Sequence, residues 1–502
     1  MRKIVMMRNV VEKNYAGILL TLWAFFILFI MSPDSPIHGP YMRTDSACFF
    51  MCGKALMNGL LPYVDFSDSK GTFLWLIYGI GYLISPRSYF GVFLISVCFY
   101  SLTFYCNYKI ANIFLSERKQ SIVVSLLMAF AYFGFVYHFE VRVEDFSTTF
   151  VSIGLYKLFE MLYCKDGGKS VRQFLIIGGC FTPLLLMKFT IAGMYGIIIL
   201  VAMWYQVREN KQFLFPLFWI ISGGLLIALP FVIHLVITGT FLPFVNEYFF
   251  KTLSTAPSMT ACWANGLDEW AKMIILNKFV LLDDSYLIFI ILGGGLLGFY
   301  VPRYKWVPVL VGLSFYLLSS FHFGGHYYYC ICSIFLLYLF IDLMLIIRPS
   351  ISKKYVILFL VYSVIWGFCE NRYGKLSDYL IWHSPKDKIH YEKISSIMSE
   401  KKKPLVLYYE LLDYGFGLES EPLPAGKYWM CQNGCSPQMQ KEHKELLYSA
   451  VADYVIMRKS VLDEDITIEK LAELNYHQCY ECSYHVDNNW NSVVDIVVFK
   501  KL

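Results

Sequence analysis

Acidic residues gather in short polar segments between long apolar stretches, where carboxylates are suited to acid–base chemistry. Asp45 opens the first segment, which continues through Asp65 and Asp68, and the pair Glu144-Asp145 opens a later apolar stretch. A carboxylate within hydrogen-bond reach of a hydroxyl can act as a general base, and Asp45 is our candidate for that role. Structural alternatives stay open. Asp45 could instead cap a helix, and Asp65 and Asp68 could stabilise a turn. Glu144 and Asp145 could complement a helix dipole.

Basic residues lie near the ends of the same apolar stretches and could stabilise a developing negative charge. Lys188 follows a run of leucines, where an ammonium group is costly without an anionic partner. His326 precedes Tyr327 at a later stretch, and Arg43 and Lys70 flank the first polar segment. The alternatives are that Lys188 reaches out to lipid headgroups, that His326 is an interfacial hydrogen-bonding group, and that Tyr327 belongs to an aromatic belt.

The composition indicates that these residues are carried by a membrane protein. Hydrophobic residues make up 57% of the 502 residues, charged residues 16% and aromatic residues 18%, and the mean hydropathy is +0.50. A soluble core of this size could not bury so much apolar surface. The first apolar span, Tyr15 to Met31, has no small-residue cleavage pattern after it, so we expect it to be a retained anchor.

We predict about eleven membrane-spanning helices, because a span needs about 20 apolar residues. Their approximate starts are Tyr15, Tyr89, Gln120, Phe146, Gln173, Thr190, Phe213, Val280, Trp306, His326 and Tyr355. The segment Thr72 to Ser85 is apolar but short. We expect it to lie in the membrane interface as an amphipathic or re-entrant helix.

The distribution of Lys and Arg sets the predicted orientation. With Thr72 to Ser85 left in the interface, the basic loops fall on the same side as the basic N-terminus, as the positive-inside rule requires. An odd number of crossings then places the tail, from about Glu370, outside. The candidate residues also face outward: Asp45, Asp65, Asp68, Glu144, Asp145, Lys188 and His326. Ionisable groups at span ends on one face suggest a hydrated pocket.

In this order, the motifs resemble those of the GT-C membrane glycosyltransferases, which use sugars carried on polyprenyl phosphate. Asp45, followed by Gly59-Leu60-Leu61-Pro62-Tyr63-Val64-Asp65, looks like the first outer loop of that family. Asp68-Ser69-Lys70-Gly71-Thr72 resembles the family's Asp-x-Lys-x-Pro run before an interfacial helix, with Gly71-Thr72 where proline is common. The protein O-mannosyltransferases (glycosyltransferase family 39) and the aminoarabinose transferases belong to this family.

Three later features add to the resemblance, which covers most of residues 1 to 370. They are the acidic pair Glu144-Asp145 at the start of the fourth span, Lys188 between two spans, and His326-Tyr327 at a late span. The resemblance implies catalytic roles for Asp45, Glu144 and Asp145, with Asp65 and Asp68 supporting the loop. It implies that the donor phosphate meets Lys188, His326, Tyr327, Arg43 and Lys70.

The resemblance therefore predicts a polytopic α-helical glycosyltransferase in the cell (plasma) membrane. It would transfer a sugar, by an inverting reaction, from a polyprenyl-phosphate-linked donor to a glycan, lipid or protein acceptor on the outer face. Cell-surface polysaccharide or other glycan biosynthesis is the expected setting. The alternative is a transporter or flippase of lipid-linked saccharides, which should carry its charges near mid-membrane in broken helices. The candidate charges here lie at outer span ends.

No cofactor is required by the sequence, but a divalent metal is an open alternative. Some members of the family hold one between the first and second acidic sites. Oxygen ligands from Asp45 with Glu144 or Asp145 would suit Mg²⁺ or Mn²⁺.

The composition becomes that of a soluble domain beyond residue 370, so we predict two domains, 1–370 and 371–502. Apolar runs at Leu405 to Tyr409, Tyr454 to Met457 and Val493 to Phe499 predict buried strands. Gln438 to Ala450 and Ile466 to Leu474 predict helices, which together give a small extracytoplasmic α/β domain. Its cysteines Cys431, Cys435, Cys479 and Cys482 could be disulfides, zinc ligands or free thiols.

Other functional classes lack support in the sequence. It has no Walker loop, no dinucleotide fingerprint, and neither the HExxH nor the GxSxG pattern. The net charge of +5 is explained by the basic loops and does not indicate a nucleic-acid partner. Gly293-Gly294-Gly295 lies within an apolar span and is expected to permit close helix packing.

Overall fold

The structure is a computed structural model, and its description covers the larger part of the chain. The described residues are 2–32, 35–36, 44–133, 143–164, 171–252, 286–301, 303–319, 326–347, 385–409, 411, 415–430, 437–463, 466–485 and 493–502. They fall into two compact units. Unit 1 comprises residues 1–32, 96–231 and 258–378, and unit 2 comprises residues 33–95, 232–257 and 379–502.

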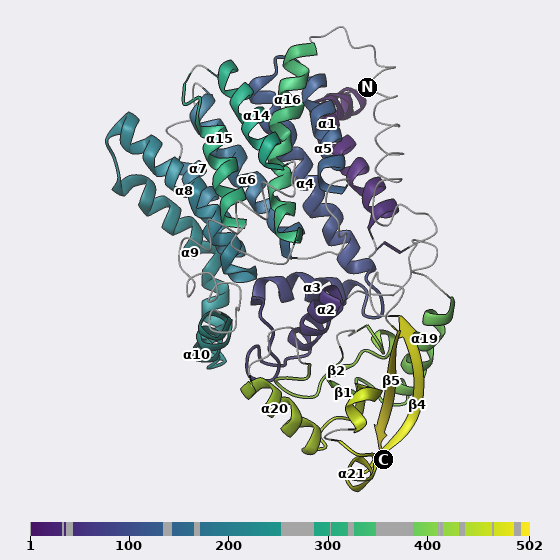
Figure 1. The fold of residues 1–502 in the computed structure, drawn as a ribbon. Helices are drawn as coiled ribbons and strands as arrows, with labels where there is room; N and C mark the ends of the chain where they lie inside the picture. The colour runs from purple at the N-terminus through teal and green to yellow at the C-terminus, as the bar shows by residue number, and fades with distance from the viewer. Residues whose placement is uncertain are drawn as a thin grey trace. The chain divides into compact units, whose positions relative to one another are not determined.

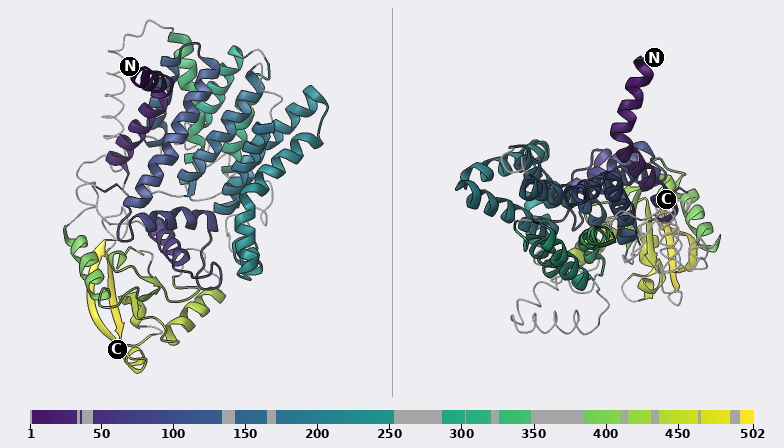
Figure 2. Two further views of the ribbon diagram at one scale, coloured as in Figure 1. Left: turned by 180° about the vertical axis from the view of Figure 1, so that it is seen from behind. Right: turned by 90° about the horizontal axis from the view of Figure 1, so that it is seen from above.

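Unit 1 consists of helices, many of which lie side by side (Figure 1). They are α1 (Arg2–Met31), most of α4 (Phe90–Phe114), α5 (Arg118–Phe133), α6 (Val143–Tyr163), α7 (Val171–Met187), α8 (Phe189–Asn210), most of α9 (Leu214–Ile237), α14 (Tyr286–Tyr300), α15 (Val307–Ser319), η4 (His326–Phe335) and α16 (Leu336–Ile347). The first part of α1 extends away from the other helices of unit 1 (Figure 2). Every predicted span before Tyr355 contains or adjoins one of these helices, and Tyr355 itself lies outside the described residues.

Close helix packing at the predicted glycine run is confirmed. A Cβ atom on Gly293 would lie 2.9 Å from the backbone nitrogen of Leu339 in α16, and one on Gly294 would lie 3.1 Å from that of Val309 in α15. The absence of side chains at Gly293 and Gly294 therefore lets the backbones of α15 and α16 approach α14 closely.

Apolar side chains on the surface of unit 1 support a membrane environment. Within the described residues, three helices are long and apolar enough to cross a membrane: α4, α8 and α9. The most apolar 18-residue stretch of α9 has a mean hydropathy of 2.5, and only 17% of this stretch is buried. Leu225 is 62% exposed and Leu226 is 70% exposed. Exposed apolar surface of this kind is typical of a helix that faces lipid. The chain is thus a multi-pass membrane protein, and the number of about eleven crossings stays a prediction.

Unit 2 begins with two packed helices, α2 (Thr44–Met57) and α3 (Thr72–Ile84). The predicted short helix at Thr72 to Ser85 is α3, and Gly71 is its N-cap. The helices meet at two glycines. A Cβ atom on Gly53 would lie 2.6 Å from the backbone nitrogen of Gly79. Because no larger residue fits there, this contact fixes how α2 lies on α3.

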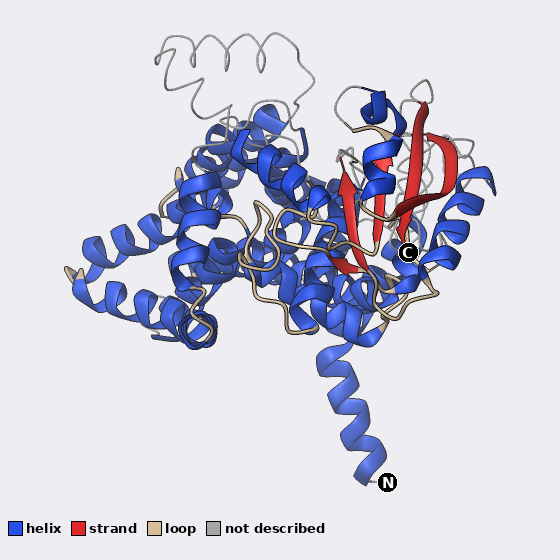
Figure 3. Ribbon diagram, turned by 90° about the horizontal axis from the view of Figure 1, so that it is seen from below, coloured by secondary structure: helices blue, strands red, loops and turns tan. Residues whose placement is uncertain are grey.

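The strands of unit 2 form one sheet of five strands in the order β2-β1-β3-β5-β4 (Figure 3). The strands are β1 (Leu405–Tyr409), β2 (Leu423–Pro424), β3 (Tyr454–Arg458), β4 (Tyr476–His485) and β5 (Val493–Lys501), and the helices of this part are α19 (Pro385–Met398), α20 (Pro437–Tyr448) and α21 (Ile468–Glu473). β1 pairs in parallel with β2 and β3, and β5 pairs antiparallel with β3 and β4. The three predicted strands and two predicted helices are confirmed; β2, β4 and α19 were not predicted.

The sheet is part of the same compact unit as α2 and α3. Contacts group residues 379–502 with residues 33–95 and 232–257. The backbone N–H of Ser67 donates to the carbonyl of Lys427 at 3.0 Å, which joins the first polar loop to the tail. The predicted domain boundary near residue 370 lies outside the described residues and stays a prediction.

Candidate functional site

In unit 1 the second acidic motif and Lys188 come together in an ion pair. Glu144 lies in the first turn of α6, and Lys188 is the extended residue between α7 and α8, where it is the N-cap of α8. Lys188 Nζ lies 2.7 Å from Glu144 Oε1, and the side chains are 11% and 4% exposed. The anionic partner that Lys188 needs is therefore supplied by the chain itself. A donor phosphate would have to share the lysine with this carboxylate.

The second acid of the pair has a different partner. The Tyr100 hydroxyl, from α4, donates to Asp145 Oδ1 at 2.6 Å. Tyr100 is 7% exposed, and the hydrogen bond joins α4 to the first turn of α6. Since Glu144 and Asp145 are adjacent in sequence, the helix points them in different directions, one toward Lys188 and the other toward Tyr100.

In unit 2, Asp45 lies in the first turn of α2, where a carboxylate complements the helix dipole. Asp45 and Asp68 both lie near the buried thiol of Cys48. Burial raises the pKa of Cys48 well above its ordinary value, and the hydrogen bond to Cys52 and the charges of Asp68 and Asp45 raise it further. The sequence-predicted acids Asp45 and Asp68 thus both act electrostatically on the same thiol of α2.

Asp65 has the turn-stabilising role that was its structural alternative. Its Oδ2 atom accepts a hydrogen bond from the backbone N–H of Leu61 at 2.7 Å. The same turn holds Tyr63 at a φ of 64°, in the left-handed region, and the Tyr63 hydroxyl donates to the carbonyl of Lys70 at 3.2 Å. Tyr63 is 1% exposed, so burial of its ring stabilises this unusual backbone.

Asp68 and Lys70 precede α3 in a compact run. Asp68 Oδ1 accepts from the backbone N–H of Ser69 at 2.6 Å, and Lys70 Nζ donates to Ser69 Oγ at 2.8 Å. Asp68 is 7% exposed, and its Oδ2 atom has no hydrogen-bond partner among the described residues. The charges of Asp68 and Lys70 act in opposite directions on the pKa of buried Cys52, which burial raises.

Three of the predicted phosphate-binding residues are not described in full. Arg43 lies outside the described residues. The backbone of His326 and Tyr327 begins the 3-10 helix η4, which continues directly into α16, but their side chains are outside the description. Their roles stay predictions. Asp45 and Lys70 belong to unit 2 and Glu144, Asp145 and Lys188 to unit 1, so the predicted single pocket also stays a prediction.

Sequence reasoning missed a cluster of charges around Glu247 in η2 (Val245–Lys251), which follows α10 (Phe241–Phe244). Glu247 Oε1 lies 2.6 Å from Lys427 Nζ, and Oε2 accepts from the Tyr428 hydroxyl at 3.0 Å and lies 3.2 Å from Lys251 Nζ. Burial opposes ionisation of Glu247, but Lys427, Lys251 and Tyr428 together hold its pKa below the usual value. Lys251 lies four residues after Glu247, but Lys427 and Tyr428 lie far from it in sequence, so no local pattern could have indicated these two partners.

A second missed residue is Lys54, which is 1% exposed in α2. Its Nζ atom donates to the carbonyl of Leu418 at 3.2 Å and lies 5.2 Å from the centre of the Phe50 ring. Burial lowers the pKa of Lys54 to about 7, and the charge of Glu421 opposes that change. Glu421 also accepts from the Tyr82 hydroxyl at 3.2 Å. These contacts hold α2 and α3 against the tail.

Solved structures with the same fold were found, although neither a protein-family model nor the sequence of a curated protein matches this chain. The crystal structure of ArnT from Cupriavidus metallidurans bound to undecaprenyl phosphate matches with a TM-score of 0.56 and 10% identity, over 97% of this chain and 98% of ArnT. Apo ArnT matches with a TM-score of 0.55 and 12% identity, over 98% of each chain. The chain has the ArnT fold. The predicted resemblance to the GT-C membrane glycosyltransferases is thus confirmed at the level of the fold.

Divalent-metal binding by Asp45 with Glu144 or Asp145 stays a prediction, since Asp45 belongs to unit 2 and the acidic pair to unit 1. Within the described residues, no group of three or more His, Cys, Asp or Glu could hold a metal ion. Glu144, one of the predicted oxygen ligands, is bound to Lys188. Cys479 and Cys482 are free thiols in β4, whereas Cys431 and Cys435 lie outside the described residues.

Proposed function

We propose that the chain is an integral-membrane glycosyltransferase of the plasma membrane. It transfers a sugar from a polyprenyl-phosphate-linked donor to a glycan, lipid or protein acceptor on the outer face. The observation that carries the proposal is the ArnT fold, matched over 97% of this chain, because the matched ArnT structure is bound to undecaprenyl phosphate. The tail, including the five-stranded sheet, would then lie outside the cytoplasm.

The acids of the first polar segment suit activation of the acceptor. In an inverting transfer, the acceptor hydroxyl attacks the anomeric carbon from the side opposite the lipid phosphate and loses its proton as the bond forms. Asp45 is our general base for that proton. Its position in the first turn of α2 stabilises the ionised carboxylate, which is the form a base requires.

The basic residues suit the departing lipid phosphate. The C–O bond to the phosphate breaks as the new glycosidic bond forms, and the phosphate keeps the electron pair. Cations placed where that charge develops lower the barrier. Lys188 and Lys70 are our candidates. Lys188 is already held in place by Glu144 at 2.7 Å, so its ammonium group is positioned before the donor binds.

The test uses the purified full-length protein in detergent with a synthetic polyprenyl-phosphate sugar and a panel of hydroxyl acceptors. We expect release of the lipid phosphate together with a glycosylated acceptor, detected by mass spectrometry. Asp45→Asn should abolish transfer while leaving folding intact, because the amide keeps the size of the side chain without its basicity. Asp495→Asn is the matched control, since Asp495 is exposed on β5.

Two outcomes would contradict the proposal. Wild-type transfer rates in Asp45→Asn would exclude the general-base role. Movement of a lipid-linked saccharide across liposomes containing the protein, without cleavage of the sugar–phosphate bond, would instead assign the chain to the transporters or flippases.

A further inference from the structure

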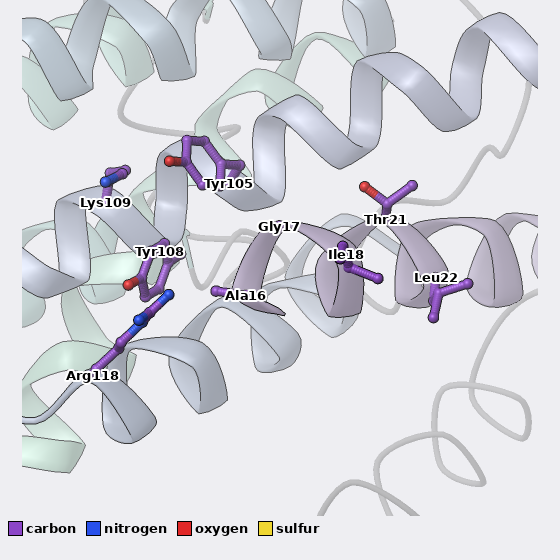
Figure 4. A pocket seen from close by; sticks show the side chains of 9 residues that line it. All are labelled: Ala16, Gly17, Ile18, Thr21, Leu22, Tyr105, Tyr108, Lys109 and Arg118. Atoms are coloured by element: carbon purple, nitrogen blue, oxygen red, sulfur yellow. The ribbon is translucent and has the colours of Figure 1, made fainter. Parts of the chain in front are cut away.

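A pocket of about 480 Å³ opens in unit 1 among α1, α4 and α5, and none of its lining residues is assigned to the proposed reaction. Figure 4 shows its lining residues, which are Ala16, Gly17, Ile18, Thr21, Leu22, Tyr105, Tyr108, Lys109 and Arg118. Nothing in the proposed transfer reaction uses this pocket, although its volume is that of a small-ligand site.

The rim of the pocket is cationic. Lys109 and Arg118 both line it, and none of the lining residues is acidic. Lys109 Nζ lies 5.3 Å from the ring centre of Tyr105 and 5.8 Å from that of Tyr108, so aromatic rings fix the position of the ammonium group. The guanidinium of Arg118 lies 4.5 Å from the ring centre of Tyr15.

The location of Arg118 also favours an anion. Arg118 is the first residue of α5, where the helix dipole is positive and a basic side chain is unfavourable. An anion in the pocket would meet the ammonium, the guanidinium and this end of the helix dipole together. The phenolic hydroxyl groups of Tyr105 and Tyr108 could donate hydrogen bonds to the same anion.

The residues of α1 that line the pocket are mostly apolar and open to the surface. Ile18 is 49% exposed and Leu22 is 62% exposed, on a part of α1 that belongs to its apolar stretch, Tyr15–Ile30. A Cβ atom built on Gly17 meets nothing within 4 Å, so the glycine leaves open space between the two kinds of wall. A ligand that fits must carry a negative charge at one end and a hydrocarbon chain at the other.

The pocket lies at one end of the apolar segments that form it. It involves the start of the apolar stretch of α1, the last turns of α4, which ends at Phe114, and the first residue of α5. Lys and Arg at this level of a membrane protein lie among the lipid headgroups. Basic pockets between membrane helices at that depth bind acidic headgroups.

We infer that this pocket binds the phosphate headgroup of an acidic membrane phospholipid, with one acyl chain lying along Ile18 and Leu22. The phosphate would contact Lys109 and Arg118. The site is independent of the proposed sugar transfer, and its occupant is a lipid of the surrounding bilayer and not the polyprenyl carrier.

The test measures lipid binding to the purified full-length protein by native mass spectrometry. The probes are dioleoyl phosphatidylglycerol, dioleoyl phosphatidylcholine and undecaprenyl phosphate. Wild type should retain phosphatidylglycerol in preference to phosphatidylcholine. The double variant Lys109→Gln, Arg118→Gln should bind phosphatidylglycerol about 25-fold more weakly, because each cation contributes about fivefold near a membrane surface.

A steric variant and two controls make the result specific to the pocket. Gly17→Leu should also lose phosphatidylglycerol, since the added side chain enters the open space without a backbone clash. Lys119→Gln removes a charge next to Arg118 that does not line the pocket, and should bind like wild type. Gly193→Leu, whose Cβ also meets nothing within 4 Å, adds the same side chain to α8 and should bind like wild type.

Three results would overturn the inference. They are equal retention of phosphatidylglycerol and phosphatidylcholine by wild type, unchanged phosphatidylglycerol binding in the double variant and in Gly17→Leu, and displacement of phosphatidylglycerol by equimolar undecaprenyl phosphate. The last would assign the pocket to the carrier lipid. None of these readouts depends on glycosyl transfer, so failure here and failure of the proposed function are distinguishable.

Discussion

Removing one or both members of the Glu144–Lys188 ion pair would separate its contribution to stability from a role in the reaction. Lys188 Nζ lies 2.7 Å from Glu144 Oε1, with side chains 11% and 4% exposed. At that separation two unit charges attract each other by about 6 kcal/mol in an effective dielectric of about 20. The cost of removing both charges from water offsets most of this attraction, so the intact pair adds little net stability. Removing only one of the two charges, in contrast, leaves the other buried without a partner and destabilises the fold.

We expect Lys188→Met and Glu144→Gln each to lower the free energy of unfolding by about 3 kcal/mol, because each leaves one buried charge without its partner. The double variant should cost at least about 2 kcal/mol less than the sum of the single costs, because neither charge then remains. The assay is chemical denaturation of the purified protein, followed by tryptophan fluorescence. If the cost of the double variant equals the sum of the single costs to within about 0.5 kcal/mol, the two residues do not interact and the pairing is refuted.

The same variants test the role of Lys188 in donor binding. If the ammonium group binds the donor phosphate, the KM for the donor should rise in Lys188→Met and stay raised in the double variant, even where stability recovers. Glu144→Gln should have a smaller effect on that KM, since Lys188 keeps its charge. Transfer restored to the wild-type rate in the double variant would assign Lys188 a structural role only.

Three further predictions concern single contacts. Burial lowers the pKa of Lys54 to about 7 in the folded protein, below its ordinary value of 10.5. The unfolded state therefore binds more protons between these pH values, and stability should rise with pH there. Lys54→Met should remove that rise in stability, which is on the order of 2 kcal/mol between pH 7 and 9. If the variant keeps the wild-type pH profile of the denaturation midpoint, Lys54 is not the source of the rise. Gly53→Ala should destabilise the fold by about 1–3 kcal/mol, because its Cβ would lie 2.6 Å from a backbone nitrogen of α3, while Gly193→Ala should be neutral; equal midpoints would contradict the close packing. Tyr100→Phe should cost about 2 kcal/mol in the same denaturation assay by removing the 2.6 Å hydrogen bond to Asp145, and no loss would mean that this bond does not form.

Local sequence patterns were sufficient for most helices and for the buried strands. Apolar stretches of about 20 residues predict helices such as α8 and α9, because such a stretch is long enough to cross a membrane as a helix. The short continuous apolar run Leu405 to Tyr409 predicts β1, because a run of this length is typical of a buried strand. β4 was missed because its sequence, Tyr476–His485, mixes Gln, Glu and Ser with aromatic residues, and it is an edge strand whose strand pairing is with β5.

The sequence could indicate which residues carry chemistry but not which of them meet. Glu144 and Lys188 each followed from their position at a span end, yet their pairing depends on how α6, α7 and α8 pack. The contact between Lys54 and Leu418 joins residues far apart in the chain, and Lys54 alone looks like a solvent-exposed lysine on an amphipathic helix. Such contacts are set by tertiary packing, which no periodicity encodes.

The position of the first polar loop depends on the tail. Ser67 donates its backbone N–H to the carbonyl of Lys427 at 3.0 Å, and the Lys427 side chain is held 2.6 Å from Glu247. Asp68 follows Ser67 directly, and Lys70 lies two residues further on, so both take their places from a backbone that the tail anchors. Residues that stabilise the tail should therefore influence the acids and cations of this loop, although they contact no substrate. This coupling explains why the sheet and the loop form one compact unit, despite their separation in the sequence.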